Sequence, residues 1–180
     1  MKACIFPILL FLLGALMLPA HLSAQKFPNL DKSSLDIASF PKRGANKVVR
    51  VTYSRPFKND REIFGGKVKY GKVWRLGANE ASEITFYKDV TIDGQSIKAG
   101  TYALFAIPNE TEWTIIFNSR LNQWGAFTYK EKHDVARVTA SVSTADEILE
   151  NFSISFDKNS GGATMYFGWD LTIAALPMKF

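Results

Sequence analysis

The chain has 180 residues, of which 47% are hydrophobic, 22% charged and 13% aromatic, and its formal net charge is +5. This length and apolar content suffice for one domain with a buried core, and they exclude a disordered chain. A single cysteine excludes a scaffold of intrachain disulfides. The charge is mild and dispersed, without a long run of one sign, so nucleic-acid binding has little support.

Residues 1–24 have the pattern of a secretory signal peptide. Lys2 precedes an apolar run over residues 5–18, and Ala24 offers a small residue at the cleavage site, with Ala20 as the alternative. The run is shorter than the ~18–20 residues that span a bilayer as a helix, so we expect a cleaved signal. The pattern predicts an exported protein, periplasmic or extracellular, with no membrane span after cleavage.

The rest of the chain is typical of short strands separated by turns. Alternating or continuous apolar residues predict strands at 47–55, 84–86, 90–92, 101–107, 113–118, 136–142, 152–156 and 165–171. Asp93-Gly94 predicts a tight hairpin, and residues 108–111 and 159–162 predict further reversals. The run at 101–107 is apolar on both faces, which indicates a central strand.

Helix signals are weak. Thr144 to Glu147 fits a capping box with room for about one turn, and Ser33 to Phe40 is a second candidate. The pattern therefore predicts an all-β fold, a two-layer antiparallel β-sandwich (jelly-roll-like) with at most one or two short helical turns. We expect an N-terminal extension over 25–46 and a single β-sandwich domain over 47–180.

Several chemistries are excluded by missing residues. Without residues 1–24 the chain has no cysteine and one histidine, His133. It therefore cannot build a Cys–His dyad or a zinc site with the usual two or three histidines. It also lacks the Gly-x-Ser-x-Gly elbow and the phosphate-binding loop Gly-x-x-x-x-Gly-Lys. We expect no metal and no cofactor.

The densest group of polar and aromatic residues lies at 70–81. It contains Trp74, Arg75, Asn79 and Glu80, with glycines that allow backbone bends. An indole offers a flat apolar face to a sugar or base, and a guanidinium suits a carboxylate or phosphate. The alternative is structural: Arg75 and Glu80 pair to hold a loop, and Trp74 packs in the core.

Two other stretches contribute candidates. Arg55 ends a predicted strand and Arg61 follows in the next loop, so both are expected at one rim, although two solvated arginines would give the same pattern. Trp124 lies beside a glycine, where ordinary packing is the alternative to a ligand platform. The predicted ligand-binding residues are Arg55, Arg61, Trp74, Arg75, Asn79, Glu80 and Trp124.

A general base at neutral pH has one place to arise, His133 beside Asp134. The nucleophile that such a base would serve is not identified by the sequence. Glu80 with a second carboxylate is the other catalytic candidate.

Short segments along the chain together resemble a bacterial family of exported proteins, the domain-of-unknown-function family numbered 2911. The matching segments are Tyr53-Ser54-Arg55-Pro56, Ile63-Phe64-Gly65, residues 70–75, residues 77–81, residues 99–105, residues 112–116, Gln123-Trp124-Gly125-Ala126 and residues 134–138. Members often carry Lys-Gly-Arg where this chain has Asn59-Asp60-Arg61, and Ser-Pro where it has Ser33-Ser34. The resemblance implies a single exported domain and brings no reaction, cofactor or partner.

These observations favour a non-catalytic module of the bacterial envelope that binds a small polar ligand, a glycan or another envelope protein. The alternative is a hydrolase that uses Glu80 or His133-Asp134 with an activated water.

Overall fold

The structure is a computed structural model that describes residues 25–180, so the predicted signal peptide lies outside the described residues. The regular secondary structure of the described part is β-strand, apart from one short 3-10 turn, η1 (Glu131–His133). Its strands are β1 (Leu35–Phe40), β2 (Val49–Ser54), β3 (Ser82–Phe86), β4 (Val90–Ile92), β5 (Gln95–Ile97), β6 (Gly100–Pro108), β7 (Glu112–Asn118), β8 (Asp134–Asn159) and β9 (Gly162–Lys179). The all-β prediction is confirmed.

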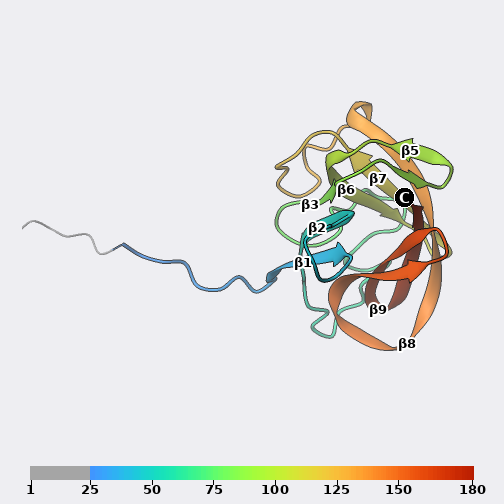
Figure 1. Cartoon of the computed structure of the whole chain (residues 1–180). Helices are drawn as coiled ribbons and strands as arrows, with labels where there is room; N and C mark the ends of the chain where they lie inside the picture. Colours follow the sequence, from blue (N-terminus) through green and yellow to red (C-terminus); the bar gives the residue numbers. More distant parts are fainter. Residues whose placement is uncertain (1–24) are drawn as a thin grey trace, which may run out of the picture.

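All nine strands belong to one open antiparallel sheet, in the order β1-β2-β3-β6-β7-β8-β9-β4-β5. The two long strands β8 and β9 form a bent hairpin that lies between β7 and β4 in the sheet (Figure 1). Their pairing shifts register between Thr144 and Leu149 and again before Ser153. Such irregularities let a strand bend sharply.

The bend turns the outer half of the hairpin back onto the first strands. Tyr53 on β2 donates its hydroxyl to the Ile154 carbonyl, and that hydroxyl accepts the Ile154 amide at 3.0 Å. Phe57 forms an isolated bridge with Asn151. One apolar core lies between these parts, with buried side chains from both β2 and the outer β8–β9 half. The arrangement is consistent with the predicted two-layer sandwich.

Local predictions for the turns and the central strand are confirmed. β6 lies between β3 and β7, and Leu104, Phe105 and Ala106 are fully buried, as the two-faced apolar pattern requires. Asp93 and Gly94 join β4 to β5 with φ of 49° and 73°. Positive φ at both central residues is typical of the tight hairpin turn that such a pair favours.

Both predictions of helical turns at 33–40 and 144–147 are wrong. Residues 35–40 form β1, which pairs along its whole length with β2 and buries Ala38. Residues 144–147 belong to β8, which continues where the sequence predicts a break between two strands. The chain stays extended through the bend, and Ala145 is buried there. A helical turn would interrupt this strand.

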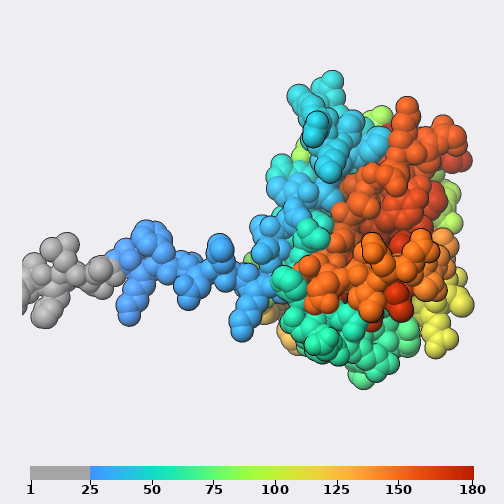
Figure 2. Space-filling view, turned by 90° about the horizontal axis from the view of Figure 1, so that it is seen from below, coloured from blue at the N-terminus to red at the C-terminus, as the bar shows by residue number. Residues whose placement is uncertain are grey.

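The first described residues lead away from the sheet. Residues 25–34 have no regular structure, and Figure 2 shows them as an extended segment projecting from the body of the protein. The sheet begins at Leu35, inside the segment that the sequence analysis treats as an N-terminal extension.

Candidate functional site

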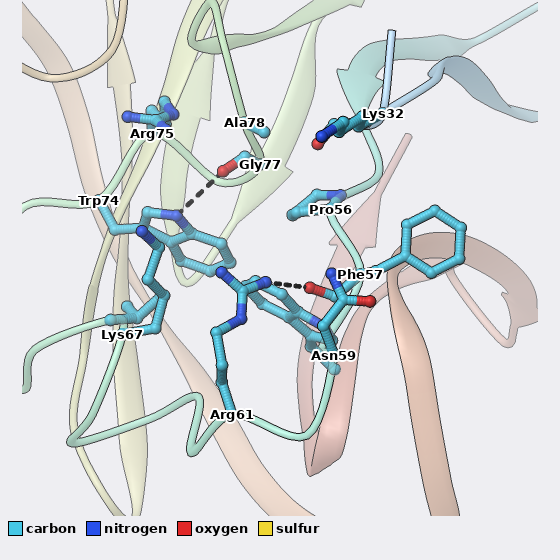
Figure 3. Close-up of a pocket in the computed structure, with 13 residues that line it drawn as sticks. Lys32, Pro56, Phe57, Asn59, Arg61, Lys67, Trp74, Arg75, Gly77 and Ala78 are labelled. Atoms are coloured by element: carbon cyan, nitrogen blue, oxygen red, sulfur yellow. Dashed lines mark hydrogen bonds between the residues drawn. The ribbon is translucent and has the colours of Figure 1, made fainter.

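A pocket of about 730 Å³ opens within the long connection from β2 to β3, between the part that follows β2 and the part that precedes β3 (Figure 3). Its residues come from four separate segments and from β9. They are Lys32, Ser33, Pro56, Phe57, Asn59, Arg61, Lys67, Val68, Trp74, Arg75, Gly77, Ala78 and Trp169.

Two tryptophans form the apolar side of this pocket. Trp74 stacks on Trp169 with ring centroids 5.9 Å apart and planes inclined by 20°. The Trp74 indole nitrogen donates to the Gly77 carbonyl at 3.2 Å, and that of Trp169 donates to the Glu150 carbonyl at 3.3 Å. Both rings are therefore fixed in orientation. Trp169 is only 2% exposed, whereas Trp74 is partly exposed at the pocket.

The first wall, residues 56–61, is held against the bend of β8. The Lys58 amide donates to the Glu150 carbonyl at 2.7 Å, and the Asn59 amide donates to the Glu150 carboxylate at 2.9 Å. Arg61 donates through Nε to the Lys58 carbonyl at 2.7 Å and through Nη2 to the Phe57 carbonyl. These contacts fix the backbone of the first wall and the position of the Arg61 guanidinium.

The second wall, residues 74–79, is anchored to β6 and to β3. Trp74 forms an isolated bridge with Ala106 of β6, and the Ser82 amide donates to the Arg75 carbonyl at 3.1 Å. Between these anchors Leu76 and Asn79 have φ of 51° and 58°. Left-handed backbone costs Leu76 about 1–2 kcal/mol, whereas asparagine adopts it more readily.

The first wall has the same feature, since Asn59 and Asp60 have φ of 48° and 55°. Both residues therefore adopt the left-handed backbone conformation that glycine favours. Of these four residues only Asn59 lines the pocket, and asparagine and aspartate adopt left-handed backbone more readily than other residues with a side chain.

The Arg75 side chain has no hydrogen-bonding or ion-pair partner among the described residues. Its Nε is buried and has no hydrogen-bond partner, and no hydrogen bond or ion pair joins its guanidinium to any of residues 25–180. Burial lowers the pKa of the guanidinium because the charged form loses hydration. A buried donor without a partner is costly, and no acceptor among residues 25–180 offsets this cost for Arg75.

The electrostatic character of the pocket is uniformly positive. Lys32, Arg61, Lys67 and Arg75 line it, and none of the described lining residues is an aspartate, glutamate or histidine. Four cations beside an apolar tryptophan surface can attract an anion and hold an attached ring. The lining has no group that could serve as a general base at neutral pH.

The predicted site residues separate into two groups. Arg61, Trp74 and Arg75 share the pocket. The other four do not line it: Arg55, Asn79, Glu80 and Trp124. The predicted structural ion pair between Arg75 and Glu80 is absent from residues 25–180.

Arg55, predicted to bind a ligand at the rim, bonds instead to other strands of the protein. Its guanidinium forms an ion pair with Asp36 at 3.0 Å, donates to the Ser153 hydroxyl at 2.8 Å and donates to the Phe152 carbonyl at 3.2 Å. It therefore joins β1 to β8, and its donors are occupied by protein acceptors.

Asn79, Glu80 and Trp124 lie where two loop segments meet. The Gly125 amide donates to the Asn79 carbonyl at 3.0 Å, and Glu80 forms an isolated bridge with Trp124. Glu80 is exposed, and Trp124 is 63% exposed. Glu80 therefore lies outside the pocket, on the exposed surface.

The His133-Asp134 pair does not form a catalytic unit. The Asp134 carboxylate accepts the Tyr129 hydroxyl at 2.6 Å, the Arg137 Nε at 2.8 Å and the Asn118 amide at 2.8 Å. These three donors occupy it, and no hydrogen bond joins it to the His133 ring among the described residues. The hydrolase alternative is therefore not favoured by the geometry.

Sequence reasoning missed several pocket residues. Trp169 is predicted only as part of the strand at 165–171, and its place in the pocket depends on the contact with Trp74. Lys32 and Lys67 are isolated surface lysines in sequence, with no local signal that would assign them to a site.

Residues 25–180 contain neither a candidate membrane-spanning helix nor a candidate metal site. No helix in that part of the chain is both long and apolar enough to cross a membrane. Within the same range no group of three or more histidine, cysteine, aspartate or glutamate side chains is placed to hold a metal ion.

Comparison with known proteins gives a family and no activity. No curated protein and no solved structure matches the chain. Residues 37–178 match the family described as "Protein of unknown function (DUF2911)", which covers the sheet from within β1 to within β9. This match spans most of the chain, and the protein therefore belongs to the DUF2911 family.

Proposed function

We propose that the protein is a non-catalytic binding module whose pocket takes a small ligand with a carboxylate or phosphate group attached to a ring. The signal-peptide pattern of residues 1–24 adds the bacterial envelope as the proposed location. The observation that carries the proposal is the buried, unpartnered Arg75 Nε in a pocket lined by cations and by no described carboxylate.

The anionic group follows from the state of Arg75. A partly desolvated guanidinium without a protein acceptor gains more from a bound anion than a solvated one does, because its hydration is already reduced. Hydrogen bonds to charged groups contribute about 1.5–3 kcal/mol. The planar fork also favours a two-oxygen acceptor, such as a carboxylate or phosphate.

The ring follows from the tryptophans. Trp74 and Trp169 line the pocket next to Arg75, and their hydrogen bonds fix both indoles before any ligand arrives. A rigid aromatic surface binds an apolar ring face without losing side-chain entropy, which improves affinity for a given contact area.

The proposal is tested with a ligand panel on the purified protein. Benzoate, phenyl phosphate and D-galacturonate are compared with the neutral analogues benzamide, phenol and D-galactose by thermal shift and isothermal titration calorimetry. We expect at least one anion to raise Tm, and its neutral analogue to have no effect.

Arg75→Gln provides the decisive variant, because it removes the charge and keeps a polar, though shorter, side chain. Arg50→Gln is the matched control, since Arg50 is an exposed arginine of β2 outside the pocket. Binding must fall in Arg75→Gln and persist in Arg50→Gln. The proposal is wrong if no anion of the panel binds, or if the two variants bind equally well.

A further inference from the structure

Two large aromatic side chains are exposed in the loop between β7 and η1. Phe127 is 85% exposed and Trp124 is 63% exposed. Single exposed aromatics are common, but two in one loop beside a candidate site point to an interaction surface.

Phe127 lies next to the guanidinium of the pocket. A Cβ placed on Gly125 would be 3.4 Å from Arg75 Nη1 and 2.9 Å from two atoms of the Phe127 ring. The position that a side chain at 125 would fill is therefore bordered by both groups. Gly125, with φ of 68°, lets the Phe127 ring lie closely over the backbone beside the Arg75 guanidinium.

The loop that carries these aromatics is held by specific bonds. The Ala81 amide donates to the Gln123 carbonyl at 2.8 Å, and the buried Gln123 side chain donates to the Arg120 carbonyl at 2.7 Å. Arg120 in turn donates to the Thr128 carbonyl at 3.3 Å. The backbone beneath Trp124 and Phe127 is thus fixed relative to the second wall of the pocket.

We propose that Trp124 and Phe127 form a second subsite for an acidic oligosaccharide, whose uronate carboxylate binds Arg75 in the pocket. This inference rests on the proposed function, because Arg75 is the anchor of both. The ligand is then longer than the pocket: one sugar lies against Trp74, and the chain continues past Gly125 over the exposed rings.

The chemistry of the surface favours a saccharide over a peptide. Peptides commonly bind by adding a strand to a free edge, but residues 79–81 and 123–125 already bond to each other at this place. The remaining features are aromatic faces, which stack on sugar rings, and Glu80 opposite Trp124, which can accept sugar hydroxyls.

The test is the dependence of affinity on chain length. Isothermal titration calorimetry compares D-galacturonate with trigalacturonate, with galactotriose as the neutral control. In the wild type we expect trigalacturonate to bind about tenfold more tightly than the monosaccharide, through the added aromatic contacts. In Phe127→Ala and Trp124→Ala that gain must shrink, with the affinity for D-galacturonate unchanged.

Tyr87→Ala is the matched control, because Tyr87 is an exposed aromatic that lies outside both subsites. Equal affinities for the two uronates, or a gain that survives in both aromatic variants, would overturn the second subsite. If Phe127 increased the affinity for a triglutamate peptide as much as the affinity for trigalacturonate, the assignment of a saccharide would be wrong. Binding of phenyl phosphate or benzoate without either uronate would refute this inference and leave the proposed function intact.

Discussion

Trp74 and Trp169 are stacked, with centroids 5.9 Å apart, although one lies in the loop before β3 and the other near the middle of β9. Trp74 also packs edge-on against Phe64, Trp113 and Phe152. The contact therefore connects an irregular segment to the core of the sheet. A loop held in this way can present Arg75 at a fixed position.

Trp74→Phe tests this anchoring. The substitution keeps an aromatic ring but removes the bond to the Gly77 carbonyl, so we expect the free energy of unfolding to fall by about 1–2 kcal/mol. Urea denaturation measures the change. Trp124→Phe is the control, and its exposed ring should change stability by less than about 0.5 kcal/mol. Equal losses in the two variants would contradict the anchoring role.

The fold was predictable wherever pairing is local and the apolar pattern regular. β6, its hairpin with β7 and the Asp93-Gly94 turn follow from residues close together in sequence. The continuity of β8 through 144–149 was not predictable in this way. That segment has a capping-box pattern, and its extended state depends on β9 and on burial of Ala145.

The candidate site was also predictable only where its features are local in sequence. Trp74 and Arg75 stand out locally because glycines bound a polar and aromatic segment. Arg55 looks equivalent to Arg61 in sequence, yet its acceptors Phe152 and Ser153 are 97 and 98 residues away. Whether an arginine serves the fold or a ligand is therefore decided by distant partners.

Because Arg55 and Arg75 have different roles, the same change to glutamine should affect stability differently at the two positions. Arg55→Gln breaks an ion pair and two further bonds that are partly exposed, so we expect a loss of about 1–2 kcal/mol in the free energy of unfolding. Arg75→Gln removes a desolvated charge without partners, so stability should stay unchanged or rise. Thermal unfolding at neutral pH measures both. A clear loss in Arg75→Gln would mean that its charge stabilises the fold.

Gly77 tests the packing of the second wall. Its φ is 151°, and an added Cβ would lie 2.8 Å from the Ser54 carbonyl oxygen, which belongs to β2. Gly77→Ala therefore combines backbone strain with a clash against a fixed strand, and we expect a loss of about 3 kcal/mol. It should also weaken anion binding, because Gly77 lines the pocket.

Gly71→Ala separates these effects. Gly71 also has a positive φ, 67°, but nothing lies within 4 Å of the added Cβ. Only the strain remains, about 1–2 kcal/mol, and anion binding should persist. If both alanine variants lose the same stability and bind equally, the close approach to Ser54 has no energetic consequence.

Tyr129 links stability to alkaline pH. Burial, and secondarily its hydrogen bond to Asp134, raise the pKa of the Tyr129 hydroxyl from 10.0 to about 12. The folded protein thus retains a proton that the unfolded chain releases near pH 10.0. The stabilisation is fully present below that pH and is lost as the pH rises toward about 12.

Tyr129→Phe removes this proton. At neutral pH the variant should be less stable by about 1–2 kcal/mol, because Asp134 loses the hydroxyl at 2.6 Å. As the pH rises from 10.0 to about 12, the wild type should lose stability faster, so the two curves of unfolding free energy converge. Tyr53 and Tyr70 also have raised pKa values, but both proteins retain them. Parallel curves across this range would show that the Tyr129 proton does not contribute to folding.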